Sequence, residues 1–212
     1  MPLSPPVARH RLHARTVSCD GFLREDGLWE IEGRIVDHRT YPFDNEWRGR
    51  VMPEMPLHEM WIRLTLDDDL SIRAVEAATD QSPFAVCPAV LPNFQRLVGA
   101  KIGPGFARAL REKLGGKEGC THIVEMLNQV ATVALQTKVT VHARALRRTK
   151  LGQPPEPQSA PRGARSAWAE ATEPGKRPPV IDTCHAWASD GDVVRRFLPE
   201  FYSGPGARDA AG

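Results

Sequence analysis

The chain has 212 residues and a nearly balanced charge, with 28 lysines and arginines against 26 aspartates and glutamates. This length suffices for one well-buried core with an appended tail, and the charge balance argues against nucleic acid or an anionic membrane as a partner. No apolar run approaches the roughly 18 residues of a membrane span, and the basic start lacks the apolar segment of a secretory signal. Four widely spaced cysteines without a CxxC pair indicate a reduced, cytoplasmic protein.

The N-terminal half has the patterns of antiparallel β-structure. The segments RTVSC (15–19) and LWEIEGRIVD (28–37) are rich in β-formers and are separated by an Asp-Gly turn signal, which predicts a hairpin. Residues 40–56 contain many turn formers and are expected to form a loop. In residues 57–80, the apolar side chains alternate with polar ones at Met60, Ile62, Leu64 and Leu66. This period predicts a half-buried strand, with a return strand after the acidic DDD turn.

Helical patterns follow a proline-rich stretch. Three prolines exclude a long helix in residues 82–94, after which short helices are expected at 94–99 and 103–116. Residues 121–148 carry an apolar stripe at helical spacing, formed by Ile123, Met126, Leu127, Val130, Ala134 and Leu135. The sequence thus predicts an α+β fold, in which a small antiparallel sheet of four to six strands is packed on one side by two or three helices.

The C-terminal part changes in composition. Residues 149–179 are rich in proline, glycine and arginine and are expected to be a disordered linker. Order resumes in residues 180–212, whose apolar side chains need burial, so this segment is expected to fold back on the core domain of residues 1–148.

Deletion of residues 180–202 tests this fold-back. Because the core would lose a covering segment, the melting temperature is expected to fall. An unchanged melting curve would contradict the prediction.

The string GCTHIVEML, Gly119–Leu127, places a thiol and an imidazole at the start of the long helix. Packing, a metal site, a thiol nucleophile and a sulfur-carrying site are all open for Cys120 and His122. The positive end of the helix dipole disfavours the imidazolium, which keeps the His122 ring in the ligating form. Glu125 lies on the same side of this helix and is expected to orient a ligand or act as a base.

The first of two resemblances is carried by the strings DGLWEIEGRIVD, PLHEMWIRLTLD, GCTHIVEML and DTCHAW. Together these strings resemble a bacterial domain-of-unknown-function family, number 2889. The order from MWIRLTLDDDLSI to GCTHIVEMLNQV is also similar to the iron–sulfur scaffold fold (IscU/NifU-like), in which one metal site lies between strand ends and a helix start.

The scaffold resemblance implies a ligand set. Its metal-binding positions fall on His58, on Asp80 with Ser82 nearby, and on His122, whereas Pro56 stands at a cysteine position. The missing thiolates oppose cluster assembly, and the remaining set His58, Asp80 and His122 suits one divalent ion of zinc, iron or manganese with open coordination positions. We expect His122 to be the ligand and Cys120 to lie beside the site.

The function predicted from these residues is that of a metal-dependent enzyme on a small, aromatic, catabolic substrate. Trp29, Trp61 and Phe84 are expected to wall the pocket, with Glu125 and His185 as catalytic groups. One such reaction is a lyase step, the retro-aldol release of formaldehyde from a lignin-derived phenol. The alternatives are a non-catalytic sulfur or iron–sulfur carrier and a small-molecule-binding accessory protein. Nucleic acid and membrane partners are not expected, and homo-oligomerisation is left open.

Overall fold

The computed structural model describes residues 3–150, 177–178 and 180–206. The chain divides into two compact units, residues 1–161 and 162–212. Most of the predicted linker, namely residues 151–176 and 179, lies outside the described residues. Thr149 and Lys150, which were expected to begin the linker, are the last residues of a long helix instead.

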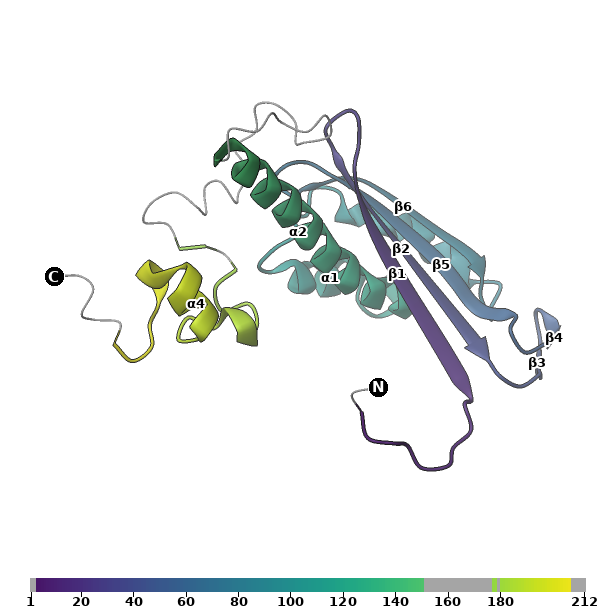
Figure 1. The fold of residues 1–212 in the computed structure, drawn as a ribbon. Helices are drawn as coiled ribbons and strands as arrows, with labels where there is room; N and C mark the ends of the chain where they lie inside the picture. The colour runs from purple at the N-terminus through teal and green to yellow at the C-terminus, as the bar shows by residue number, and fades with distance from the viewer. Residues whose placement is uncertain (1–2, 151–176, 179, 207–212) are drawn as a thin grey trace. The chain divides into compact units, whose positions relative to one another are not determined.

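The first unit is built on a four-stranded antiparallel sheet in the order β1-β2-β5-β6 (Figure 1). The strands are β1 (His13–Leu23), β2 (Trp29–Arg39), β5 (Pro56–Leu66) and β6 (Ile72–Gln81). Both predicted hairpins are confirmed, because β1 pairs with β2 and β5 pairs with β6. The side chains of β5 that were predicted to be buried are buried, as Met60, Ile62 and Leu64 show.

A layer of helices covers the apolar face of the sheet. It consists of the 3-10 helix η1 (Cys87–Leu97), α1 (Phe106–Leu114), the short η2 (Gly116–Glu118) and α2 (Thr121–Lys150). Helix α2 lies along β1 and β2 (Figure 1). It approaches β2 closely at Gly33, where an added Cβ would lie 2.7 Å from Val130. The predicted α+β class with helices on one side of the sheet is confirmed.

The opposite face of the sheet is polar and carries ion pairs between neighbouring strands. Arg34 on β2 pairs with Glu59 on β5, and Arg63 on β5 pairs with Glu32 on β2 and Glu76 on β6. These residues alternate with the buried ones, so the two-residue period of each strand separates charge from core. The site described below lies on the helix-covered face.

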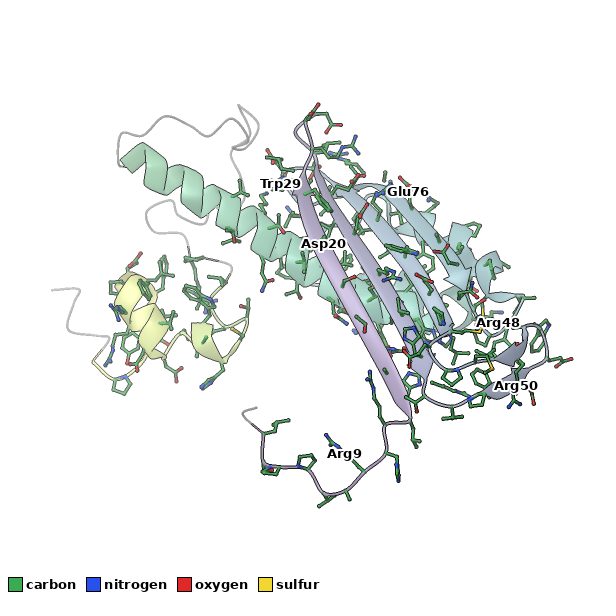
Figure 2. All side chains as sticks on the ribbon, turned by 45° about the vertical axis from the view of Figure 1, so that its right-hand side comes forward. Arg9, Asp20, Trp29, Arg48, Arg50 and Glu76 are labelled. Carbon is green, nitrogen blue, oxygen red and sulfur yellow. The ribbon has the colours of Figure 1, made fainter. Side chains whose placement is uncertain are left out.

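A small hairpin occupies the segment that was expected to be a loop. Strands β3 (Phe43–Asn45) and β4 (Gly49–Val51) pair around a turn in which the Asn45 side chain accepts hydrogen bonds from the backbone of Trp47 and Arg48. Arg48 in turn donates to the backbone carbonyl of Pro56, where β5 begins. Figure 2 shows Arg48 and Arg50 at one end of the sheet and Trp29 towards the other.

The second unit contains only short elements in its described part. These are η3 (His185–Trp187), α4 (Asp192–Phe197) and η4 (Pro199–Phe201), with Ile181 and Val194 buried. His185, predicted as a catalytic group, lies in the helical turn η3. The fold-back of this unit on the core stays a prediction. No helix among the described residues is long and apolar enough to cross a membrane.

Candidate metal centre

The register of the sheet places three polar side chains in one row on the helix-covered face. Arg15 on β1 is paired with Asp37 on β2, and Asp37 is paired with His58 on β5. Asp37 follows Trp29, Ile31, Gly33 and Ile35 on the inward side of β2, so its carboxylate points under the helical layer. The β2–β5 register shifts directly after Asp37, which marks a bulge of the kind often found beside functional sites.

Helix α2 adds His122 to this row from its first turn. The His122 Nε2 atom lies 3.8 Å from Asp37 Oδ2, and the two imidazole rings of His58 and His122 have centroids 3.9 Å apart. The backbone carbonyl of Cys120 accepts the first hydrogen bond of the helix, from Val124. Cys120 is therefore the N-cap residue, and Thr121 is the first residue of the helix.

Asp37 is the buried centre of the cluster. Its side chain is fully buried, and it accepts two hydrogen bonds from Arg15, Nε to Oδ1 at 2.7 Å and Nη2 to Oδ2 at 2.8 Å. The Nδ1 atom of His58 lies 2.9 Å from Oδ2, and His13 Nε2 lies 3.4 Å from Oδ1. Burial alone would raise the pKa of Asp37, but Arg15, with a smaller effect of His58, lowers it from 3.8 to about 2. Asp37 is thus a carboxylate at neutral pH.

Both histidines are held in the neutral form. Burial lowers the pKa of His58, and the neighbouring His122 lowers it further, while Asp37 acts in the opposite direction. Burial followed by the charge of Arg15 lowers the pKa of His122, against the effects of Asp37 and Glu125. The cluster therefore combines one anionic oxygen ligand with two neutral imidazoles, which is the protonation state that metal binding requires.

The spacing of the donor atoms fits one divalent ion. One donor atom each from Asp37, His58 and His122 can be chosen so that all lie within 4.8 Å of one another. Two ligand atoms at about 2.1 Å from an ion are about 3.4 Å apart in a tetrahedral site. The separations from Asp37 Oδ2, 2.9 Å to His58 Nδ1 and 3.8 Å to His122 Nε2, lie on either side of that value.

Cys120 contacts His122 on the side of the ring that carries Nδ1. Its Sγ atom lies 3.7 Å from His122 Nδ1 and 3.6 Å from the sulfur of Met60. Since Nε2 is the His122 nitrogen nearest Asp37, a proton on Nδ1 directed at sulfur would leave the Nε2 lone pair free for an ion. This is the arrangement expected from the sequence, with His122 facing the cluster and Cys120 beside it.

The structure brings together two of the three residues predicted as metal ligands. His58 and His122 meet, but Asp80 does not join them. The Asp80 carboxylate accepts a hydrogen bond from the indole of Trp61 at 2.8 Å. Trp61 lies on β5 between the buried Met60 and Ile62, so its side chain points to the opposite face of the sheet. The β5–β6 register shifts between Glu59 and Met60, so Asp80 has no paired residue on β5. The carboxylate that lies against both histidines is Asp37.

The residues predicted to be catalytic or to form aromatic walls do not gather around the cluster. Glu125 lies at the solvent edge of the cluster, where it accepts a hydrogen bond from Arg15 Nη1 at 3.2 Å. His185 belongs to the second unit, so its role stays a prediction. Trp29 lies at the start of β2, eight residues from Asp37, and bonds Asp68. Trp61 and Phe84 do not line the cluster either: the first bonds Asp80, and the second packs edge-on against Trp47.

Asp37 and Arg15 are site residues that the sequence reasoning missed. Asp37 was only the last residue of the predicted strand segment 28–37, although it continues the inward series that starts at Trp29. A charged residue on the inward side of a strand was the available signal, because buried charges are paired or functional. Arg15 begins the segment RTVSC, whose prediction as part of a hairpin is confirmed, but no site role was predicted for it.

These features define an α+β domain with a partly buried Asp-His-His cluster, centred on the buried Asp37, between its sheet and the start of its long helix α2. The chain belongs to the family described as Protein of unknown function (DUF2889), whose model matches residues 13–136. That range contains all the residues of the cluster. No curated protein and no solved structure matches the chain. The family resemblance is thus confirmed, whereas the similarity to iron–sulfur scaffolds finds no support.

Proposed function

We propose that this protein is a metal-dependent enzyme that holds one divalent ion through Asp37, His58 and His122 and acts on a small organic substrate. The observation that carries the proposal is the meeting of a buried carboxylate with two neutral imidazoles. Zinc, iron and manganese all accept such a set. Three protein ligands leave coordination positions for substrate, as in catalytic rather than structural zinc sites.

The groups around the cluster would have different roles in the reaction. A bound ion would supply Lewis acidity toward a substrate oxygen. Arg15 fixes the plane of the Asp37 carboxylate through two parallel hydrogen bonds, which is the geometry that guanidinium and carboxylate prefer. Glu125 is the carboxylate that stays outside the ligand set, and its side chain is 58% exposed. It is the candidate for moving a proton to or from the substrate.

For the reaction itself, we keep the lyase step that was predicted from the sequence. Retro-aldol release of formaldehyde from a lignin-derived phenol needs an acid and a base beside a polarised oxygen, and the cluster offers such groups. The proposed aromatic walls do not support an aromatic substrate, since neither Trp29 nor Trp61 lies at the cluster. A lyase acting on such a phenol is therefore proposed on the sequence alone.

A metal-free acid–base site is the second candidate, and Arg15 favours it. Asp37 already has a cationic partner on both oxygens, and it faces His58 Nδ1 in the way that a carboxylate orients a catalytic histidine. His58 would then exchange protons with substrate through Nε2. The sulfur-carrier alternative gains no such support, because among the described residues Cys120 is the cysteine that contacts the cluster, and iron–sulfur clusters take several thiolates.

Metal content of the full chain and its variants tests the proposal. The wild-type protein is expected to hold close to one divalent ion per chain by elemental analysis, and His58→Ala, His122→Ala and Asp37→Asn to lose it. Cys120→Ser and Asp80→Asn are matched controls that should retain it, the first because the thiol lies on the outer side of His122, the second because Asp80 lies elsewhere.

Each outcome separates the candidates. An apoprotein that takes up no zinc, iron or manganese on reconstitution would rule the metal site out and leave the metal-free histidine site. Equal metal loss from Cys120→Ser and His122→Ala would make the thiol a ligand. Metal loss from Asp80→Asn alone, with Asp37→Asn unaffected, would return the carboxylate role to Asp80.

A further inference from the structure

We propose that the substrate of this site is an organic oxyanion, a carboxylate or a phenolate, and that Arg15 binds it at the solvent edge of the cluster. This inference rests on the proposed function, because it names the substrate class of the same site. It is drawn from the order of exposure of the side chains, from the unused hydrogen-bond donors of Arg15 and from the charge of the cluster.

Exposure rises in steps from the centre of the cluster to solvent. The Asp37 side chain is 0% exposed, His58 12% and His122 25%. Arg15 follows with 36%, and His13 and Glu125 lie outermost with 49% and 58%. A ligand entering from solvent therefore meets Arg15, His13 and Glu125 before it reaches the two histidines. Among these outer groups, Arg15 is the permanent cation.

Arg15 has hydrogen-bond donors that its described contacts do not use. A guanidinium carries five N–H groups, and the described contacts of Arg15 use three of them, two to Asp37 and one to Glu125. One N–H on Nη1 and one on Nη2 remain. The bond to Glu125 is also replaceable, because it is long at 3.2 Å and its acceptor is more than half exposed. An incoming oxyanion can displace Glu125 and take a paired hydrogen bond from Arg15.

The charge of the cluster favours an anion as this ligand. Asp37 and Arg15 cancel, and the two histidines would bind an ion as neutral imidazoles. With a divalent ion bound, the single charge of Glu125 leaves the group net positive. Helix α2 adds the positive end of its dipole, with no acidic residue in its first turn to offset it. A monoanionic substrate would compensate this excess, whereas a cationic one would be repelled.

Calorimetric titration of the metal-loaded full chain with three probes tests the proposal. Benzoate represents a carboxylate, 4-nitrophenolate at mildly alkaline pH a phenolate, and benzamide a neutral molecule of the same shape as benzoate. Benzoate or 4-nitrophenolate is expected to bind, and benzamide to bind at least about tenfold more weakly, because it lacks the charge-assisted hydrogen bonds to Arg15. Whichever anion binds identifies the substrate as carboxylate or phenolate.

Variants assign the binding to Arg15. Arg15→Gln should weaken the anion about tenfold or more, and Glu125→Gln should tighten it because the competing carboxylate is gone. Arg50→Gln is the matched control, since Arg50 forms an exposed pair with Asp44 in the β3–β4 hairpin. If Arg15→Gln fails to fold, Glu125→Gln alone decides the proposal, because an unchanged or weaker anion affinity in that variant overturns it.

Metal analysis of the same samples keeps the two proposals apart. Bound metal with equal affinity for benzoate and benzamide overturns the oxyanion site and leaves the metal centre standing. Anion binding that depends on Arg15 in a chain that takes up no metal has the opposite meaning. It overturns the metal-dependent function and supports the oxyanion site.

Discussion

Replacement of Asp37 by alanine is expected to lower the free energy of unfolding by about 3 kcal/mol. Removing one partner of a buried ion pair costs about 3–5 kcal/mol, because the other partner is left without compensation. The lower end of that range applies because Arg15 is 36% exposed and can turn toward water. His58 Nδ1 would also lose its polar contact with the carboxylate, at 2.9 Å from Oδ2. Urea unfolding in the presence of a chelator measures the loss free of any contribution from bound metal.

Asp44→Ala is the matched control for this variant. Asp44 also pairs with an arginine, Arg50, but both side chains are more than half exposed. Exposed pairs contribute about 0–1 kcal/mol, so the control should unfold almost like the wild type. Equal losses in the two variants would show that Asp37 is not the buried centre of the cluster.

The pH dependence of unfolding gives a second measure of the same carboxylate. The folded pKa of about 2 lies below the ordinary 3.8, so the stabilisation by ionised Asp37 is present above pH 4 and is lost as the pH falls toward 2. The difference corresponds to about 2 kcal/mol, and it should be missing in Asp37→Asn. The histidines act earlier, because their lowered pKa values remove stability as the pH falls below about 6.5.

Local sequence patterns were sufficient to predict the main elements of the fold. The alternation of Met60, Ile62, Leu64 and Leu66 fixes the inward face of β5, since neighbouring side chains in a strand point to opposite faces. The β3–β4 hairpin was missed because its strands have three residues each, too few for a visible period. The segment around it contains enough turn formers to be read as a loop.

The cluster depends on pairing across the sheet, which no local pattern specifies. Asp37 gains its partners from Arg15, 22 residues earlier, from His58, 21 residues later, and from His122 on the long helix. Each of these lies in an element that could be predicted, but the register that aligns them is set by the whole hairpin and by a bulge. Asp80 was predicted as a metal ligand from a resemblance in order and spacing, but its carboxylate accepts a hydrogen bond from Trp61 instead.

Lys138→Met is expected to stabilise the protein by about 1–3 kcal/mol. Lys138 occupies the inward stripe of α2, one turn after Ala134, and its side chain is only 2% exposed. Its ammonium group has no hydrogen-bond partner among the described residues. A buried polar group without a partner costs about 1–3 kcal/mol in protein variants, and methionine fills a similar volume without that cost. Chemical unfolding at neutral pH measures the gain.

The gain should depend on pH in a defined direction. Burial lowers the pKa of Lys138, and the carboxylates of Asp68, Asp69 and Asp67 oppose this effect without removing it. At neutral pH the unfolded chain therefore binds its proton more readily than the folded chain, which costs the wild type stability. As the pH rises toward the ordinary value of 10.5 the unfolded lysine also loses its proton, so the advantage of Lys138→Met should shrink. Lys101→Met, at a position more than half exposed, should show neither the gain nor this trend. A Lys138→Met variant less stable than the wild type would mean that the ammonium group has a stabilising partner outside the described residues.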